Sequence, residues 1–392
     1  MINIQTGKSV INQRPSSQIV QLRKTLHRYP ELSGEEKETS ARLIQAFQAV
    51  HPSKLYRDIA GHGLIVQIDN PEHGPTIIFR AELDALPIRE KNTFGHRSQT
   101  DGVAHKCGHD GHIAILLGLG FWLQYNPLQN GRIIFLFQPA EETGQGAKRV
   151  LSDEHFKSLN PDYIFALHNW PGYKMGEIVL KEGPMFCASR GLNISLRGKT
   201  AHAAQPETGI NPAGAVSRII ERLQQVPSDN AFINQFVSIT IVKIHMGDDA
   251  FGTSPGSAEI GITIRSDDDD TMERLVRYVK HIIQQISRKE MISFDLQWRD
   301  EFPVTANHSH AVQQIRQAAN RLAMPVQIIK DPFKPSEDFG WFTQQYKGAI
   351  FAMGAGEDWP DLHSDDYDFP DLLIEPAIQI LFQIAKQLCA GA

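Results

Sequence analysis

The sequence lacks several features that would each mark a class of protein. Its longest apolar stretch, residues 113–123, is interrupted by glycine and is far shorter than the roughly 20 residues that a membrane span needs. We therefore expect no transmembrane helix. The formal net charge is −6, from 39 Lys and Arg against 45 Asp and Glu, and the pI is about 6.2. A chain without a strong basic field is not expected to bind nucleic acid through the phosphate backbone.

Cysteine is scarce, and the N-terminal segment has no targeting features. The first 18 residues lack the basic start, the apolar segment and the small-residue cleavage site of a secretory signal. We therefore expect a cytoplasmic protein. In that compartment the three cysteines, Cys107, Cys187 and Cys389, are expected to be reduced thiols.

Several catalytic and binding motifs are also missing. The sequence contains no C-x-x-C pair, no H-E-x-x-H and no G-x-x-x-x-G-K, which excludes zinc ribbons, zincins and P-loop nucleotide hydrolases. Residues 252–256 fit the pattern G-x-S-x-G. A nucleophile elbow needs a strand-to-helix turn, however, and we expect a strand after Pro255, so we reject this interpretation.

The elements that are present indicate an α/β protein. The length of 392 residues is typical of two or three domains. Short β-branched runs, typical of buried strands, alternate with helical patterns. We expect strands at residues 63–69, 76–80, 132–138, 163–167 and 178–181, and helices at 17–27, 37–50 and 111–125. Together they predict an α/β core.

The pattern changes near residue 188 and changes back near residue 300. In between we expect the order strand, helix, strand, strand, helix, strand, which is the ferredoxin-like arrangement. The expected elements are residues 192–197, 211–225, 236–245, 258–265, 271–287 and 291–298. A helix at 310–322, a strand at 349–353 and a helix at 372–388 then restore the α/β pattern. The predicted organisation is one α/β domain, formed by residues 1–187 and 301–392, with an inserted domain at 188–300.

The acidic run at residues 267–270 allows two interpretations. Four consecutive aspartates could hold a cation. We favour the other interpretation, in which the run caps the following helix and interacts with the positive end of its dipole.

Cysteine, histidine and glutamate side chains follow successive strands of the first region. They are Cys107 and His109 in a glycine-containing turn, Glu141 and Glu142 after the strand that ends at residue 138, and His168 at the end of the next strand. Ligands of open α/β sheets bind at such strand ends. Cys107 and His109 could ligate a metal, act as a Cys–His nucleophile, or belong to a purely structural turn. Beside a metal, one glutamate would ligate it and the other would relay a proton.

Further candidates lie elsewhere in the chain. His363 stands in a polar loop before the last helix. Glu82 and Asp84 end a strand, where they would orient a ligating imidazole. In the insert, His202 follows the first strand, and taken alone it is more simply a surface histidine.

Taken in chain order, these segments resemble the co-catalytic metallopeptidase and amidohydrolase family of aminoacylases, hippurate hydrolase and carboxypeptidase G. The resemblance is nearest to the branch of hippurate hydrolase and the indole-acetyl-amino-acid hydrolases. It rests on residues 26–32, 80–87, 105–112, 139–144, 167–171, 198–204, 336–339 and 363–369, which cover almost the whole chain. It implies a zinc-peptidase-like α/β catalytic domain with a mixed sheet and an inserted lid domain that often dimerises.

The resemblance also implies a metal centre. It makes five residues the ligands of two divalent metal ions: Cys107, His109, Glu142, His168 and His363. Cys107 would bridge the two ions. A mixed sulfur, nitrogen and oxygen donor set suits zinc, and manganese, cobalt and nickel remain alternatives.

The implied reaction is amide hydrolysis. Two metal ions lower the pKa of a shared water, and the metal-bound hydroxide attacks the carbonyl while Glu141 transfers the proton as general base. His202, from the lid of the same or a partner subunit, would stabilise the oxyanion, and Arg265 would face the substrate carboxylate.

Two positions depart from the family pattern. Gly252 stands where relatives carry a lid asparagine that helps to hold the substrate, which puts the anchoring of an amino-acid carboxylate in doubt. Lys106 stands where a small residue is common. It would either place positive charge near the mouth of the site or be solvated, and we favour the solvated lysine.

We therefore predict a metal-dependent amidohydrolase that cleaves N-acyl amino acids or similar small amides. One alternative is a dipeptidase or carboxypeptidase with the same centre. Others are a metal-independent cysteine nucleophile and a catalytically idle relative that binds metabolites, although an idle protein would not need Glu141. A homodimer through the lid domain is expected, without a nucleic-acid or membrane partner.

Overall fold

The computed structural model describes residues 17–390, and the chain forms two compact units. The first unit comprises Met1–Met185, Ala306–Asp331 and Asp338–Ala392, and the second comprises Phe186–Thr305 and Pro332–Glu337. Each unit has a hydrophobic core of its own. Most of the N-terminal stretch that lacks secretory features lies outside the described residues.

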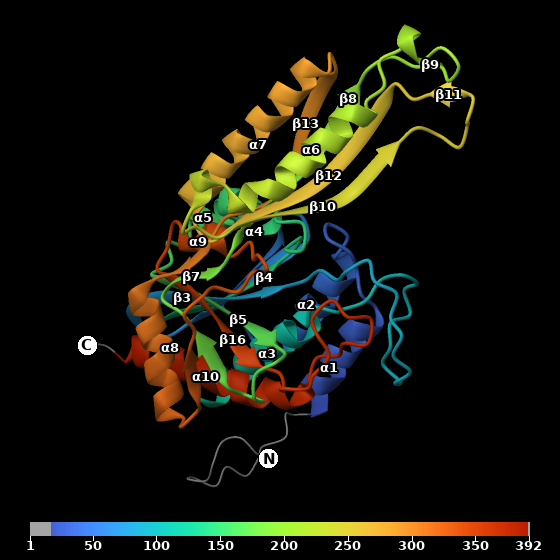
Figure 1. Cartoon of the computed structure of the whole chain (residues 1–392). Coiled ribbons are helices and arrows are strands. Elements are labelled where there is room, and N and C mark those ends of the chain that lie inside the picture. Colours follow the sequence, from blue (N-terminus) through green and yellow to red (C-terminus); the bar gives the residue numbers. More distant parts are fainter. Residues whose placement is uncertain (1–16, 391–392) are drawn as a thin grey trace. The chain divides into compact units, whose positions relative to one another are not determined.

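A mixed sheet of eight strands forms the centre of the first unit (Figure 1). In spatial order it contains β1 (Lys54–Ile59), β2 (Gly63–Asp69), β4 (Asn130–Gln138), β3 (Glu72–Glu82), β5 (Tyr163–Trp170), β16 (Gly348–Gly354), β6 (Ile178–Leu180) and β15 (Val326–Ile328). Strands β4, β3, β5 and β16 are parallel, whereas β1 and β2 pair antiparallel. The predicted mixed-sheet α/β class is confirmed. Because the four central strands are parallel, their carboxyl ends meet at one edge of the sheet.

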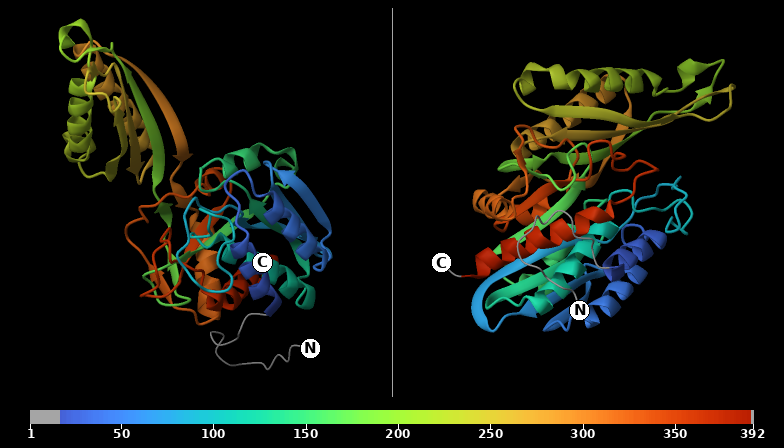
Figure 2. Two further views of the ribbon diagram at one scale, coloured as in Figure 1. Left: turned by 90° about the vertical axis from the view of Figure 1, so that its right-hand side faces the viewer. Right: turned by 90° about the horizontal axis from the view of Figure 1, so that it is seen from below.

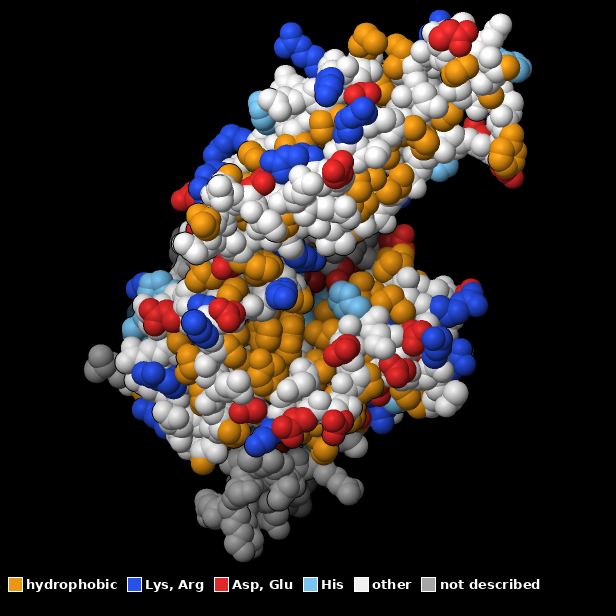
Figure 3. Space-filling model, in the orientation of Figure 1, with side chains coloured by type: hydrophobic (Ala, Val, Ile, Leu, Met, Phe, Trp, Pro, Cys, Tyr) orange, Lys and Arg blue, Asp and Glu red, His pale blue; other side chains and the backbone are white. Residues whose placement is uncertain are grey.

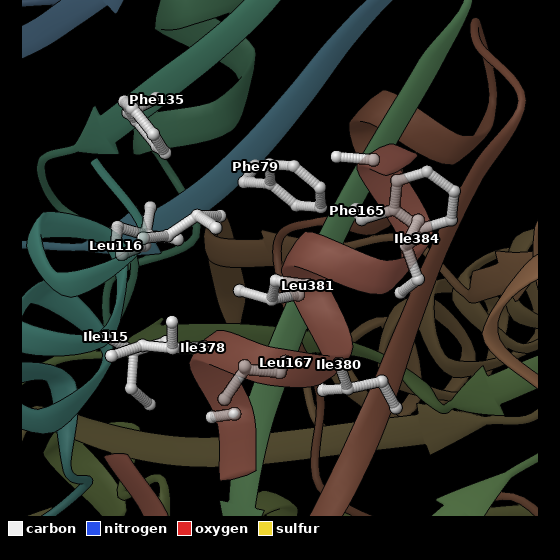
Figure 4. Close-up of a cluster of buried hydrophobic side chains, with 14 of the residues drawn as sticks. Phe79, Ile115, Leu116, Phe135, Phe165, Leu167, Ile378, Ile380, Leu381 and Ile384 are labelled. Atoms are coloured by element: carbon white, nitrogen blue, oxygen red, sulfur yellow. The ribbon is translucent and has the colours of Figure 1, made fainter. Parts of the chain in front are cut away.

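Helices share a core with one face of this sheet. They are α1 (Ser17–Arg28), α2 (Lys37–Gln48), α3 (His109–Tyr125), α8 (Ser309–Arg321) and α10 (Ile374–Cys389). Figure 4 shows Phe79, Phe135 and Phe165 of the sheet facing Leu116 of α3 and Leu381 of α10. Successive side chains of a strand point to opposite faces. The neighbouring residues on β3, β4 and β5 are also buried, so both faces of the sheet are covered.

Glycines in α3 allow the C-terminal part of the chain to pack closely against this helix. A Cβ at Gly118 would lie 2.3 Å from Cδ1 of Ile378 in α10, and a Cβ at Gly111 would lie 2.3 Å from the ring of Phe369. Because α3 begins at His109, this close packing also fixes the position of a predicted metal ligand.

One stretch of the described residues, Asp371–Cys389, is long and apolar enough to cross a membrane. It contains α10 and the turn before it, and 61% of it is buried inside the structure. Its apolar side chains, among them Leu381 and Ile384, belong to the core of the first unit. Burial of this kind is typical of the core helix of a folded domain.

The second unit is a four-stranded antiparallel sheet covered by two helices (Figures 1 and 2). The strands in spatial order are β10 (Val237–Met246), β12 (Ser257–Ser266), β8 (Ala188–Arg197) and β13 (Ser293–Phe302), and the helices are α6 (Ala213–Gln225) and α7 (Asp269–Lys289). Their chain order confirms the predicted ferredoxin-like arrangement. Since a strand and not a helix follows Pro255, the rejection of a nucleophile elbow is also confirmed.

The acidic run caps α7. The side chain of Asp268 accepts a hydrogen bond of 2.7 Å from the backbone N–H of Thr271, and Asp269 accepts one of 2.9 Å from the N–H of Val304. Asp269 and Asp270 lie in the first turn, near the positive end of the helix dipole. The capping interpretation is confirmed.

We predict that Asp268→Ala lowers the free energy of unfolding by about 1 kcal/mol, because it removes the N-cap of α7. Asp268→Ser keeps a capping oxygen and should recover most of this loss. Asp270→Ala removes the same charge from the first turn and should cost less. Urea unfolding with and without calcium measures these effects. A calcium-dependent stability that Asp268→Ala abolishes would instead support the cation site.

Candidate metal centre

The predicted metal ligands converge at the carboxyl edge of the central strands. Cys107 comes from the turn before α3, His109 from the first residue of α3, Glu142 from the turn after β4, His168 from β5 and His363 from the loop after β16. Their possible ligand atoms form two sets, within each of which all atoms lie within 4.8 Å of one another: Cys107, His109 and His168, and Cys107, Glu142 and His363. Because Cys107 belongs to both sets, the arrangement has the form of two adjoining cation sites with a shared sulfur.

The separations between the ligand atoms leave room for ions. Glu142 Oε1 lies 3.8 Å from Nε2 of both His109 and His363, and Cys107 Sγ lies 3.4 Å from His168 Nε2. The separations of 3.8 Å exceed a hydrogen bond, and an ion between two such atoms can lie at the metal–ligand distance of about 2.0–2.2 Å from both. Cys107, His109 and His168 are buried, whereas His363 is exposed.

Gly108 makes the turn between the first two predicted ligands possible. Its φ of +94° lies in the region that favours glycine. A Cβ at this position would also lie 2.3 Å from Asn169 Oδ1. Any other residue would therefore strain the backbone and displace the end of β5, which carries His168.

Backbone carbonyl groups orient two of the imidazoles. His109 Nδ1 lies 2.8 Å from the carbonyl oxygen of Asp84, and His168 Nδ1 lies 2.8 Å from that of Asn169. A carbonyl oxygen can only accept, so Nδ1 carries the proton in each ring. In the neutral ring each Nε2 then keeps a lone pair directed at the shared site, as a metal ligand requires.

Asp84 connects the turns that carry His109 and Glu142. Its carboxylate is fully buried and accepts hydrogen bonds from Ser33 Oγ at 2.7 Å and from the backbone N–H of Glu142 at 2.9 Å. Burial alone would raise the pKa of Asp84, but the interactions with His109 and Ser33 outweigh it and hold that pKa below its ordinary value. Asp84 therefore stays charged and ties both turns together.

The electrostatics of the site fit a cation. Burial opposes a charge on His109, yet Asp84, Glu82 and Glu142 raise its pKa to about 10. Among the described residues His109 Nε2 has no hydrogen-bond partner, although it is buried and faces the two glutamates. Negative charge that draws a proton onto a buried imidazole would equally attract a metal ion. Burial and nearby His112 hold the pKa of His168 well below its ordinary value, which keeps it neutral.

Glu141 lies beside the ligand sets, and hydrogen bonds of nearby backbone N–H groups hold it in place. It is 5% exposed, and its Oε2 lies 4.0 Å from His109 Nε2. Its Oε1 accepts a hydrogen bond of 3.4 Å from the backbone N–H of Asp338. The preceding Ala140 has a φ of +54° and donates its N–H to Glu36 Oε1 at 2.8 Å. These contacts aim the Glu141 carboxylate at the ligands.

Some buried charges have partners other than those that the sequence suggested. Glu82 forms no hydrogen bond with a predicted ligand among the described residues; it pairs with Arg80 and with Nδ1 of His112 at 2.6 Å. Arg80 also binds Asp338 at 2.6 Å. Sequence reasoning gave Arg80 and Asp338 no role, although both lie in segments of the resemblance, and Asp338 positions Glu141.

A second buried cluster, here termed the buried ion network, lies next to the ligand turn. It consists of Arg23, His27, Glu90, Asp110 and Asp368. His27, Asp110 and Asp368 are spaced as metal ligands would be. However, Arg23 Nη1 lies 2.6 Å from Asp368 and 3.2 Å from Asp110, so its guanidinium already supplies the cation.

The environment of Lys106 differs from both predictions made from the sequence. Both the solvated lysine and the charge at the mouth of the site are wrong, because the side chain is fully buried. Its Nζ donates hydrogen bonds to Glu90 Oε1 at 2.6 Å and to the carbonyl oxygen of Tyr367 at 2.7 Å. A buried ammonium group needs such partners to offset its desolvation.

His202 and Arg265 belong to the second unit, and their roles toward a substrate stay predictions. His202, in the short strand β9 (Ala201–His202), is exposed, and its Nδ1 accepts a hydrogen bond of 3.0 Å from the backbone N–H of Ala204. Its Nε2 therefore carries the proton of the neutral ring. Arg265 Nη1 donates to Ser336 Oγ at 2.8 Å and to the carbonyl oxygen of Lys334 at 3.2 Å.

Comparisons with known proteins cover most of the chain. Residues 78–387 match peptidase family M20/M25/M40. The chain is 32% identical to an N-acetyl-L-cysteine deacetylase from Bacillus subtilis, over 95% of this chain and 88% of that protein. It is 30% identical to a hippurate hydrolase from Campylobacter jejuni, over 93% and 94%. A solved dinuclear metal-binding peptidase of the M20 family from Bacillus subtilis is similar with a TM-score of 0.80 at 26% identity, over 96% and 98%.

The buried ion network predicts how stability depends on pH. Burial lowers the pKa of His27, but the hydrogen bonds to Asp110 and Glu90 outweigh it and raise that pKa from its ordinary 6.5 to about 9. The charged His27 therefore stabilises the fold fully below about pH 6.5, and this contribution is lost as the pH rises through about 9.

We predict that the stability difference between wild type and His27→Gln is largest below pH 6.5 and shrinks by up to about 1.4 kcal/mol per pH unit as the pH approaches 9. Urea unfolding at pH 6 to 10 measures this difference. His281→Gln, on the exposed face of α7, is the control and should show no such trend. A pH-independent difference for His27→Gln would contradict the charged state.

Proposed function

Because this chain belongs to peptidase family M20/M25/M40, as its motifs predicted, we propose that it is a metal-dependent amidohydrolase that cleaves N-acyl amino acids or similar small amides. The observation that carries the proposal is the pair of ligand sets that share Cys107, with the buried Glu141 beside them. Relatives at 30–32% identity are named as a deacetylase of N-acetyl-L-cysteine and as a hippurate hydrolase, which supports an acyl amino acid as substrate.

Two divalent ions are the proposed cofactor, held by Cys107, His109, Glu142, His168 and His363. When bound, they supply a Lewis acid for the amide carbonyl and lower the pKa of water. The donor set of one sulfur, three nitrogens and one carboxylate favours zinc, and manganese, cobalt and nickel are the alternatives.

Glu141 is the proposed general base. Its Oε1 is engaged by the N–H of Asp338, and its Oε2 lies on the side of His109. In this role Oε2 takes a proton from the attacking water and later gives it to the nitrogen of the leaving amine. The burial of Glu141 excludes bulk water from this transfer.

The proposed contribution of the second unit is oxyanion stabilisation and substrate anchoring. His202 is suited to stabilise the oxyanion because the Ala204 N–H fixes its ring as an Nε2–H donor. Arg265 would face the substrate carboxylate, with its guanidinium anchored on Ser336 and Lys334. Gly252 leaves that anchoring without the asparagine of the family pattern.

We propose a cytoplasmic homodimer that pairs through the second unit. Strand β10 is at the edge of its sheet, and its residues Val242, Ile244 and Met246 are exposed. Hydrophobic side chains gather over this strand in Figure 3. An unpaired apolar edge strand favours pairing with an identical strand of a second copy.

We predict that Glu141→Gln keeps both metal ions but loses about 10²- to 10⁴-fold in kcat, because only proton transfer is removed. The matched variant Glu142→Gln, at the adjacent carboxylate, should instead lose metal. Amine release from N-acyl amino acids and dipeptides, with chelated protein as control, measures turnover, and metal analysis measures retention. A preference for dipeptides would indicate a peptidase with the same centre.

Three outcomes of this experiment would contradict the proposal. Full activity of Glu141→Gln would remove Glu141 from its role as base. Turnover that resists chelators would indicate a Cys107 nucleophile activated by His168, whose Nε2 lies 3.4 Å from Sγ. If no substrate of the panel is hydrolysed although two ions are bound, the protein is a catalytically inactive relative that binds metabolites.

We also predict that His202→Ala lowers kcat by about 10²- to 10³-fold with little change in KM, because the oxyanion forms only in the transition state. Steady-state kinetics measure the split between the two constants. His281→Ala removes an exposed imidazole on α7 of the same unit and should leave both unchanged. A rise in KM alone would show that His202 binds the ground state instead.

A further inference from the structure

The loop segment at residues 363–367 is held at both ends by Lys106. The backbone N–H of His363 donates a hydrogen bond of 2.8 Å to the carbonyl oxygen of Lys106. At the other end, Lys106 Nζ donates one of 2.7 Å to the carbonyl oxygen of Tyr367. Lys106, directly before Cys107, thus bonds to both ends of this segment, which begins with the proposed metal ligand His363.

The same segment is held from a second side by residues 90–92. The backbone N–H of Lys91 donates to the carbonyl oxygen of Asp365 at 2.9 Å, and Asn92 Nδ2 donates to that of Asp366 at 2.9 Å. The bond of 2.6 Å between Lys106 Nζ and Glu90 Oε1 joins the two sides. Lys106 therefore connects the Cys107 turn, the 90–92 segment and the His363 loop.

His363 needs such support because of its backbone conformation. Its φ is +65°, in the left-handed region that residues other than glycine rarely adopt. A conformation of this kind persists only where the surrounding structure fixes it. Its side chain is about half exposed, so packing alone does not hold the imidazole in place.

A buried lysine at position 106 also carries a large desolvation penalty. Burying an ammonium group costs free energy that its partners only offset, and an apolar residue would often be at least as stable. A purely structural role therefore does not explain the choice of lysine. The two bonds of Nζ have a geometric consequence that an apolar side chain could not provide, since they fix Tyr367 against the turn of Cys107.

We propose that Lys106 is a positioning residue that fixes His363, and with it the ligand set of Cys107, Glu142 and His363, through the hydrogen bonds of Nζ with Tyr367 and Glu90. The proposal rests on the metal centre of the proposed function. It assigns Lys106 to one of the two ion sites, because the set of Cys107, His109 and His168 has its own supports in Asp84, Asn169 and Gly108.

The test is cobalt binding by the full-length protein carrying Lys106→Met. Cobalt titration and competition with a chromophoric chelator report the number of ions and the affinity of each. The variant should keep one ion at wild-type affinity and hold the second about 10- to 100-fold more weakly, the typical effect of losing a residue that orients a ligand. Where turnover is measurable, kcat should fall more than KM rises.

Two matched variants separate positioning from fold stability. Lys91→Met removes an exposed lysine that pairs with Asp365 on the same segment, and it should leave both affinities unchanged. Lys106→Met with Glu90→Gln removes the uncompensated buried carboxylate and should recover the unfolding free energy while the second ion stays weak. The amide oxygen that Glu90→Gln leaves at this position can still accept a hydrogen bond from His27.

Three results would overturn the proposal. In the first, Lys106→Met binds two ions with wild-type affinities. In the second, both ions weaken equally and the double variant restores them, which would mean that Lys106 acts only through fold stability. In the third, the wild type binds fewer than two ions, and the proposed function fails as well. The wild type could also bind two ions and hydrolyse no substrate tested. The cobalt titration would still test the role of Lys106 in that case, because it measures the affinity of each ion and not turnover.

Discussion

Buried negative charge at the carboxyl edge of the central sheet must be compensated if this part of the chain is to fold. The parallel strands β4, β3, β5 and β16 bring acidic and imidazole side chains to one edge, where burial makes uncompensated charge costly. Four buried carboxylates around the ligand sets have cationic partners: Glu82 and Asp338 pair with Arg80, Asp110 with Arg23 and His27, and Glu90 with Lys106. At the ligand sets the proposed metal ions supply the matching charge.

The same ion pairs set the geometry of the site. Asp84 holds the turn of Glu142 and faces His109, and Asp338 donates its N–H to Glu141. The left-handed His363 depends on contacts from residues distant in the chain, with Lys106 at both ends of its segment. The side chain of Lys106 thus takes part in both charge compensation and positioning, so a variant that removes it is expected to affect both stability and ligand geometry.

The sequence predicted the features that depend on local pattern. Periodicity located the four strands of the ferredoxin-like sheet and six of the eight strands of the central sheet, but it missed the edge strands β1 and β15. It also located the helix at His109, and the Asp268 cap followed from a helix start signal. Strand ends and turns made Cys107, His109, Glu142 and His168 candidates, and the resemblance to the amidohydrolase family then implied the full ligand set with His363. The sequence could not predict that Lys106 is buried, since its partners Glu90 and Tyr367 are 16 and 261 residues away. The pairing of Glu82 with His112, instead of with a proposed ligand, likewise depends on how β3 packs against α3.

In the proposed metal centre, Cys107 Sγ would be shared by two metal ions at the edge of the sheet. Anomalous diffraction from crystals of the zinc-reconstituted protein, recorded on both sides of the zinc edge, tests this arrangement most directly. We expect two peaks about 3.5–4 Å apart. Both should lie within bonding distance of Cys107 Sγ, one beside His109 and His168 and the other beside Glu142 and His363. A single peak, or two peaks of which only one contacts the sulfur, would contradict this arrangement.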